Sequence, residues 1–210
     1  GRRAAARQLA TSVAGVILPP PLCESKAIVS EFRHAGVPVV SIASGHFSDT
    51  ISCVRIDDHR ASHDMVSYLI ARGHTRIGYI KGDPNQTASA HRWQGYRDAL
   101  AEAGIAYDDK LVQPGYFTYR SGLDAAEKLL ALRRPPSAIF ASNDDMASAV
   151  VSVAHRRGLD VPRDLSVVGF DDTSAATMVW PELTTLHQPV AEMADSAVDI
   201  LLREIRRTPS

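Results

Sequence analysis

The sequence predicts an α/β fold with parallel sheets, and two observations carry that prediction. Short apolar runs alternate with segments whose apolar residues recur at helical spacing, almost throughout the chain. Glycine follows several of the helical segments, as expected at a helix C-terminus. Alternation of this kind is typical of parallel strands joined by right-handed helical crossovers. The pattern fits one large sheet, and it fits equally well two lobes with a cleft between them.

The apolar runs predict about eight strands. The clearest lies at 165–170 and is almost continuously apolar, so we expect it to be buried on both faces, as in a parallel sheet. Pro38 lies near the start of another strand, where proline is tolerated. The other strands are predicted at 13–18, 37–42, 53–56, 76–80, 111–113, 138–141 and 183–186.

Helical spacing predicts about six helices. In one of them Trp93, Tyr96 and Leu100 share a face, and Gly104 ends the helix. The segment between 170 and 183 is interpreted as irregular. The other helices are predicted around 28–35, 61–70, 123–130, 146–153 and 190–205, and four of the six end at Gly36, Gly73, Gly104 and Gly158.

Composition excludes several classes of protein. The chain has 210 residues, 45% of them hydrophobic and 22% charged, which is enough apolar material for one large domain or two small ones. A net charge of −1 gives no global electrostatic reason to bind nucleic acid or an anionic membrane. Cys23 and Cys53 have no partner spacing, so we interpret them as reduced cysteines of a cytoplasmic protein. The sequence contains neither a membrane-spanning run nor a signal-peptide pattern.

Polar residues follow several of the predicted strands. Asp171 and Asp172 come directly after the strand at 165–170, Asn143 follows another strand, and Arg92 lies in the first turn of a helix after a third. Ligands of open parallel sheets bind beyond the carboxyl ends of the strands. Arginine donates hydrogen bonds in a fixed fork, asparagine donates and accepts, and aspartate accepts. These residues therefore predict a site for a small, hydroxyl-rich ligand.

Each of these residues also has a purely structural interpretation. The two aspartates could cap a following turn. Asn143 or Asp144 could be the N-cap of the next helix, a role that is compatible with ligand binding. Arg92 could pair only with Asp98 or with solvent. Among the aromatic residues, Trp93 is predicted to lie in the core, whereas Phe117, in a polar loop, is a better ligand candidate.

Motifs for catalysis are missing. The sequence has no HExxH, no GxSxG, no phosphate-binding loop and no GxGxxG, so we predict no catalytic residue and no cofactor. His59 and His63 have the i,i+4 spacing that can hold a metal on one helix face, but no Glu or Cys follows at ligand spacing. We therefore predict no metal, with His59 before the helix and His63 on its solvent face.

An ordered set of runs covers nearly the whole chain. They lie at 13–18, 36–40, 68–80, 136–144, 158–172 and 181–189, together with Arg92, Gly95, Tyr96, Ser121 and Gly122. Any one run is weak, but the ordered set resembles the effector-binding domain of bacterial transcriptional regulators of the lac repressor and galactose repressor family.

The resemblance implies a two-lobed fold like that of periplasmic sugar-binding proteins. The first lobe would take residues 1–62 and 189–210, and the second would take 63–188. A small effector, expected to be a sugar or sugar derivative, would lie in the cleft between them. The resemblance further implies a homodimer. Arg92, Asn143 and Asp171 would contact the effector, Phe117 would pack against it, and Gln188, at a lobe crossover, would sense closure.

Two departures from the family pattern lead us to expect a fragment truncated at both ends. The helix-turn-helix, the hinge and a strand–helix–strand unit are absent before residue 13, and a closing strand is absent after 210. Operator DNA would therefore be bound only through the absent N-terminal domain. Ala43 stands where many relatives have an acidic residue. One rival is a periplasmic sugar-binding protein of the same fold. Another is an α/β enzyme, which the missing motifs disfavour.

Overall fold

Residues 1–43 and 51–207 are described by a computed structural model of the chain. They form two units. Unit 1 comprises Gly1–Ile56, Asn85–Ala88 and Pro189–Ser210, and unit 2 comprises Asp57–Pro84 and Ser89–Gln188. Each unit has its own sheet, and every strand pair among the described residues is parallel. The predicted α/β class with parallel sheets and flanking helices is confirmed.

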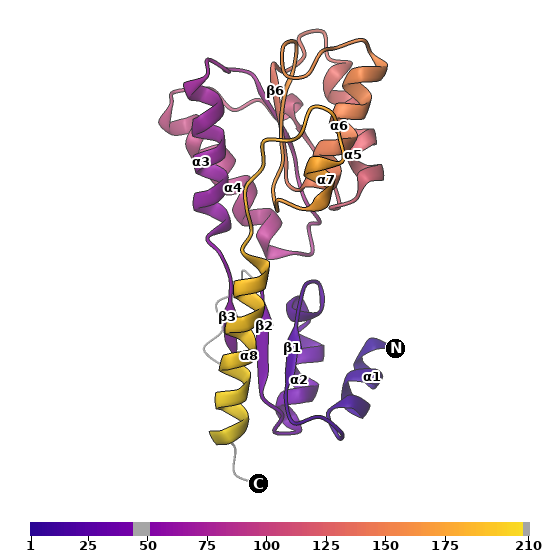
Figure 1. Ribbon diagram of the computed structural model, residues 1–210, viewed down its shortest axis with the longest axis vertical. Helices are drawn as coiled ribbons and strands as arrows, with labels where there is room; N and C mark the ends of the chain where they lie inside the picture. The colour runs from indigo at the N-terminus through magenta and orange to yellow at the C-terminus, as the bar shows by residue number, and fades with distance from the viewer. Residues whose placement is uncertain (44–50, 208–210) are drawn as a thin grey trace. The chain divides into compact units, whose positions relative to one another are not determined.

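Unit 1 contains a three-stranded sheet in the order β1-β2-β3. The helix α8 packs on all three strands, and α2 packs on β2 and against α1 (Figure 1). Gly15 leaves room for α8, because a methyl group there would lie 2.7 Å from Leu201 Cδ1. The elements are β1 (Val16–Leu18), β2 (Val39–Ile42), β3 (Ser52–Val54), α1 (Arg2–Leu9), η1 (Leu22–Glu24), α2 (Lys26–His34) and α8 (Val190–Arg207).

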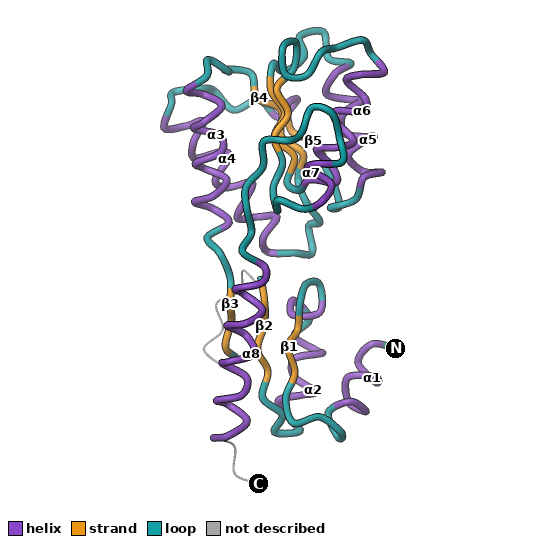
Figure 2. Tube along the Cα trace, viewed as in Figure 1, coloured by secondary structure: helices purple, strands orange, loops and turns teal. Residues whose placement is uncertain are grey.

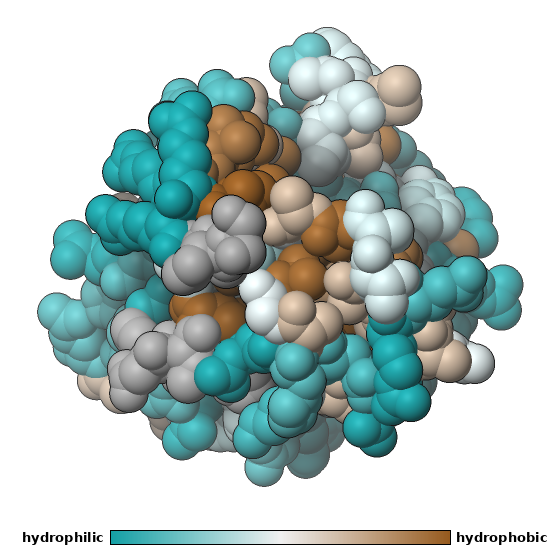
Figure 3. Space-filling model, turned by 90° about the horizontal axis from the view of Figure 1, so that it is seen from below, coloured by the Kyte–Doolittle hydropathy of each residue, from teal (hydrophilic) through white to brown (hydrophobic). Residues whose placement is uncertain are grey.

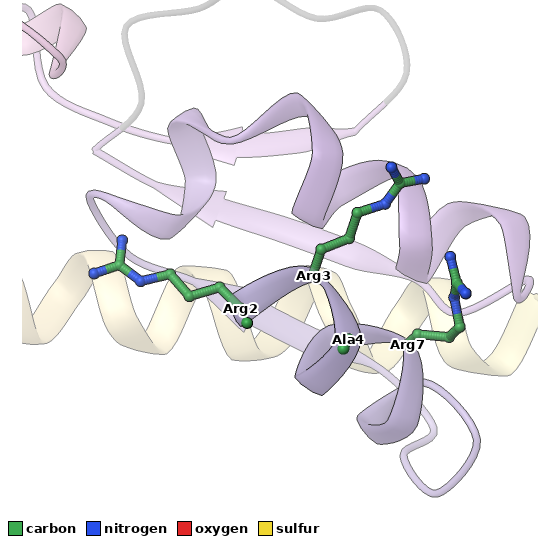
Figure 4. Close-up of a pocket in the computed structure, with 5 residues that line it drawn as sticks. Arg2, Arg3, Ala4 and Arg7 are labelled. Atoms are coloured by element: carbon green, nitrogen blue, oxygen red, sulfur yellow. The ribbon is translucent and has the colours of Figure 1, made fainter.

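Helix α1 was not predicted, because its only buried side chain is that of Ala6 and it has no stripe of large apolar residues. Ion pairs connect α1 to α2 instead. Arg3 and Arg7 extend from the same side of α1 (Figure 4), and their Nε atoms donate to the Glu31 carboxylate at 2.5 and 2.8 Å. The two arginines hold the pKa of Glu31 well below its usual range.

The core of unit 1 is small and its surface keeps apolar residues. Its buried cluster includes Leu18, Ile28 and Phe32. The side chains of Val198 and Leu202 on α8 remain about half exposed. Apolar residues also gather in the middle of the face drawn in Figure 3, with hydrophilic residues around them. Among the described residues, the apolar side chains of unit 1 are therefore only partly buried.

Unit 2 contains a four-stranded sheet in the order β5-β4-β6-β7. In the register, Ile77 is opposite Ala138 and Ile80 is opposite Ala141. Helices α3 and α4 lie on one side of this sheet and α5 and α6 on the other (Figures 1 and 2). The elements are α3 (Asp58–Ala71), β4 (Ile77–Ile80), α4 (Thr87–Glu102), η2 (Asp109–Leu111), β5 (Val112–Gln113), α5 (Tyr119–Leu130), β6 (Ala138–Ala141), α6 (Asp144–Arg156), β7 (Ser166–Val168) and α7 (Ser174–Thr177).

Burial explains why this sheet forms where the apolar runs predict it. All four residues of β4 and all four of β6 are buried, as expected for central strands covered on both faces. Glycine allows the helices to approach closely: a methyl group at Gly95 of α4 would lie 2.2 Å from the backbone oxygen of His59 in α3. Since α3 packs along α4 in this way, residues 57–62 group with unit 2, whereas the family resemblance assigned them to the first lobe.

Besides α1, two segments differ from the sequence-based prediction. The run at 183–186 forms no regular strand; Thr184 makes one isolated parallel bridge with Val168, and His187, just after the run, makes another with Asp171. The short helix α7 lies in the segment interpreted as irregular. Among the described residues, no helix combines the length and the apolar character needed to cross a bilayer.

Candidate functional site

Arg92 is the centre of a polar cluster at the carboxyl ends of the unit 2 strands. Its side chain is buried, and its Nε donates to Asp58 Oδ1 at 2.7 Å. Its Nη1 donates to the backbone oxygen of Ser142 at 2.5 Å and lies 3.4 Å from Asp171 Oδ1. The guanidinium therefore connects the start of α3 with the residues that follow β6 and β7.

An aromatic ring lies directly against this guanidinium, and a second lies nearby. Arg92 Cζ lies 3.5 Å from the centroid of the Phe170 ring and 5.7 Å from that of Phe117. Stacking on an aromatic face is favourable for a buried guanidinium. The orientation of Arg92 is thus set by a carboxylate, a carbonyl and a ring together.

Asp171 follows β7 and is held by both backbone and side chain. Its backbone N–H donates to Leu186 O at 2.8 Å, and its Oδ1 accepts from Gln188 Nε2 at 2.5 Å. Its φ is 108°, an unusual value for a residue with a side chain and one that tends to be found at functional sites. Burial raises the pKa of the Asp171 carboxyl to about 6, although Arg92 and Gln188 act in the opposite direction.

Asn143 is the N-cap of α6, as one interpretation of the sequence predicted. Its Oδ1 accepts from Met146 N at 3.0 Å, while its Nδ2 donates to the backbone oxygen of Phe117 at 3.2 Å. Phe117 has a φ of 57°, and its ring lies over Gly82, where a methyl group would be 2.0 Å from Cζ. The amide thus holds the turn that presents the Phe117 ring.

The structure joins the five predicted site residues in one cluster. Arg92 and Gln188 both bond Asp171, and Asn143 bonds Phe117, whose ring faces Arg92. The pairing of Arg92 with Asp98, considered from the sequence, is not observed. Asp172 lies 2.8 Å from His187 Nδ1, so the two adjacent aspartates have different partners.

Two buried carboxylates were not among the predicted site residues. Asp58, in the first turn of α3, anchors Arg92, and the rule used for Asp171 would have found it, since it also follows a predicted strand. Asp144 is buried and accepts from Thr173 N at 2.7 Å and from the Thr185 hydroxyl at 2.6 Å. A methyl group at Gly169 would lie 2.3 Å from Asp144 Oδ1, so glycine leaves room for this carboxylate.

The histidine pair lies elsewhere in unit 2. His59 is within α3, so the prediction that it precedes the helix is wrong; its Nε2 lies 2.8 Å from Asp98 Oδ2. His63 Nε2 lies 2.7 Å from Glu102 Oε2. Each imidazole thus has a carboxylate partner on α4. Within the ranges 1–43 and 51–207, no group of three or more His, Cys, Asp or Glu residues is arranged to hold a metal ion.

Known proteins of similar sequence and structure share this architecture. Residues 66–210 match the family of periplasmic binding protein-like domains. Catabolite control protein A of Priestia megaterium is 38% identical over 180 residues, which is 85% of this chain and 54% of that protein. The transcriptional repressor CytR of Escherichia coli strain K12 is 40% identical over 153 residues, 73% of this chain and 45% of that repressor.

A solved complex of the transcriptional regulator CelR with cellobiose is 33% identical, with a TM-score of 0.92 over 100% of this chain and 64% of that one. The fold and the matched residues define a periplasmic binding protein-like domain. The chain belongs to the lac repressor and galactose repressor family of transcriptional regulators. It spans about half the length of the curated relatives it matches.

Proposed function

We propose that this chain is the ligand-sensing domain of a bacterial transcriptional regulator and that it binds a small sugar or sugar derivative at the Arg92 cluster. The supporting observation is the fixed guanidinium. Arg92 is held by Asp58, Ser142 and Phe170, and its Nη2 makes no hydrogen bond to any described residue. A preorganised donor beside an acceptor carboxylate suits a polyhydroxylated ligand.

Each member of the cluster has a distinct proposed role. Arg92 donates to a ligand oxygen, and Asp171 accepts from ligand hydroxyls. Asn143 contributes its amide, and the Phe117 ring packs against an apolar face of the ligand. Gln188 is the last residue of unit 2 before the chain passes into unit 1, so a ligand that engages it acts on the connection between the units. The solved relative that contains cellobiose supports this ligand class.

In the whole protein, we propose that the effector controls operator binding by a separate helix-turn-helix domain in a homodimer. The full name of the relative CytR describes it as a helix-turn-helix-type repressor. That protein is about twice as long as the matched segment. An effector shifts a conformational equilibrium only through a difference in its affinity for the two states. The sensing contacts would therefore have to differ between the operator-bound and released states.

Isothermal titration calorimetry against mono- and disaccharides, with cellobiose included, tests the proposal. We expect saturable binding of at least one sugar and a loss of about tenfold or more in Asp171→Asn, because a hydrogen bond to a charged acceptor is removed. Asp145→Asn is the matched control, since Asp145 is exposed in the first turn of α6. Equal affinity of both variants would reject the site, and no heat from any sugar would reject the ligand class.

A further inference from the structure

Unit 2 has a pocket that shares no residue with the Arg92 cluster. It has a volume of about 350 Å³ and lies between the end of α3 and the outer edge of β7. Its walls include Tyr68 and Arg72 from α3 and its C-cap, and Val167 and Thr184 from the β7 side. Asp58 begins α3 and Ala71 ends it, so helix geometry separates the two sites by about 20 Å.

The pocket carries a positive charge that no acidic side chain in its walls neutralises. Arg72 Cζ lies 3.4 Å from the centroid of the Tyr68 ring, and its Nη1 makes a single long hydrogen bond, 3.5 Å, to Tyr68 O. Arg72 forms no ion pair with any described carboxylate, and neither Asp nor Glu lines the pocket. A stacked guanidinium with free N–H groups is a binding group for a planar or tetrahedral oxyanion.

A backbone donor lies on the opposite wall. Ser166 N donates to Ser137 O, and the register places Ser166 and Val168 as the residues whose backbone groups face β6. The Val167 N–H therefore points to the outer edge of the sheet. Val167 lines the pocket, and its N–H donates to no described residue. This backbone N–H is therefore available as a donor to an acceptor in the pocket.

We infer that this pocket is a second binding site, for a small organic anion that carries a carboxylate or a phosphate ester. The anionic group lies between the Arg72 guanidinium and the Val167 N–H. Leu69, Pro162 and Val168 form the apolar wall that contacts the body of the ligand. The site is independent of the proposed sugar site, because none of its residues belongs to the Arg92 cluster.

Amide NMR titration of the ¹⁵N-labelled chain tests the inference with three probes that share a phenyl ring. Phenyl phosphate and benzoate are the two anions, and benzyl alcohol is the neutral control. We expect a saturable shift of the Val167 amide with an anion and little shift with benzyl alcohol. The anion that binds more tightly shows whether the pocket prefers a phosphate ester or a carboxylate.

Variants distinguish the pocket from general surface charge. Arg72→Gln should weaken anion binding by about tenfold to a hundredfold, since a charged hydrogen-bond donor is lost. Arg60→Gln is the matched control on the same helix, where Arg60 pairs with Asp64 at the surface, and it should bind as the unmodified chain does. Asp171→Asn should also bind the anion normally, which separates this result from failure of the sugar site. Unsaturable shifts, equal binding of benzyl alcohol, or equal losses in the Arg60 and Arg72 variants would overturn the inference.

Discussion

Replacing Asp171 with asparagine should change how the stability of unit 2 depends on pH. Burial raises the pKa of this carboxyl from its usual 3.8 to about 6. The folded state therefore holds a proton over a pH range in which the unfolded chain has lost it. Since the folded state binds more protons there, the free energy of unfolding falls as the pH rises from about 4 to about 6.

The size of this effect follows from the change in pKa. A difference of about two pKa units corresponds to about 3 kcal/mol between the two ends of the range. In the unmodified chain this contribution is fully present below about pH 4 and is lost above about pH 6. The asparagine side chain does not titrate, so the stability of Asp171→Asn relative to the unmodified chain should rise by up to about 3 kcal/mol from pH 4 to pH 7.

Urea unfolding followed by tryptophan fluorescence measures this difference. The two tryptophans, Trp93 and Trp180, both belong to unit 2, so the signal reports on the unit that contains Asp171. The exposed Asp145→Asn variant serves as the control. A stability difference between Asp171→Asn and the unmodified chain that stays constant from about pH 4 to pH 7 would refute the reasoning.

Three further predictions rest on neighbouring features. If ligand hydroxyls donate to ionised Asp171, calorimetry should show sugar affinity about tenfold weaker at pH 5 than at pH 7, because protonation through a pKa of about 6 removes the acceptor. Gly95→Ala should lower the free energy of unfolding in urea by about 1–3 kcal/mol, because its methyl group would overlap His59 O. Gly104→Ala, whose methyl group would meet open space, should lower it by about 1 kcal/mol because of the φ of 69°. Asn143→Ala removes the helix cap and should lower the free energy of unfolding by about 0.5–2 kcal/mol. Asn143→Asp should keep the cap and lose only the bond to Phe117. Thermal unfolding of both variants measures the difference.

Helix ends were among the most predictable features of this chain. Gly36, Gly73, Gly104 and Gly158 were each expected to stop a helix, and each has a φ between 69° and 90°. Residues with side chains avoid that conformation, so the position of glycine carries the information locally. The β6 strand was likewise predictable, because an apolar run of four buried residues needs no knowledge of distant partners.

Features that depend on distant partners were less accessible. The sequence offered Asp98 as a neighbour for Arg92, six residues away, but the structure pairs Arg92 with Asp58, 34 residues away. Helix α1 is held by ion pairs to α2 rather than by an apolar stripe, so periodicity could not reveal it. The segment at 183–186 has a strand-like composition but makes only one isolated bridge, through Thr184.

The role of Asp144 has a consequence for how relatives of this chain could diverge. This carboxylate bonds Thr173, two residues after Asp171, and Thr185, which precedes the Leu186 whose carbonyl accepts from the Asp171 N–H. Anchoring is thus assigned to Asp144 and Asp58, and Asn143 adds the cap of α6 and the bond to Phe117. Because Asn143 bonds the backbone oxygen of Phe117, an exchange of the ring at that position leaves these anchoring bonds in place.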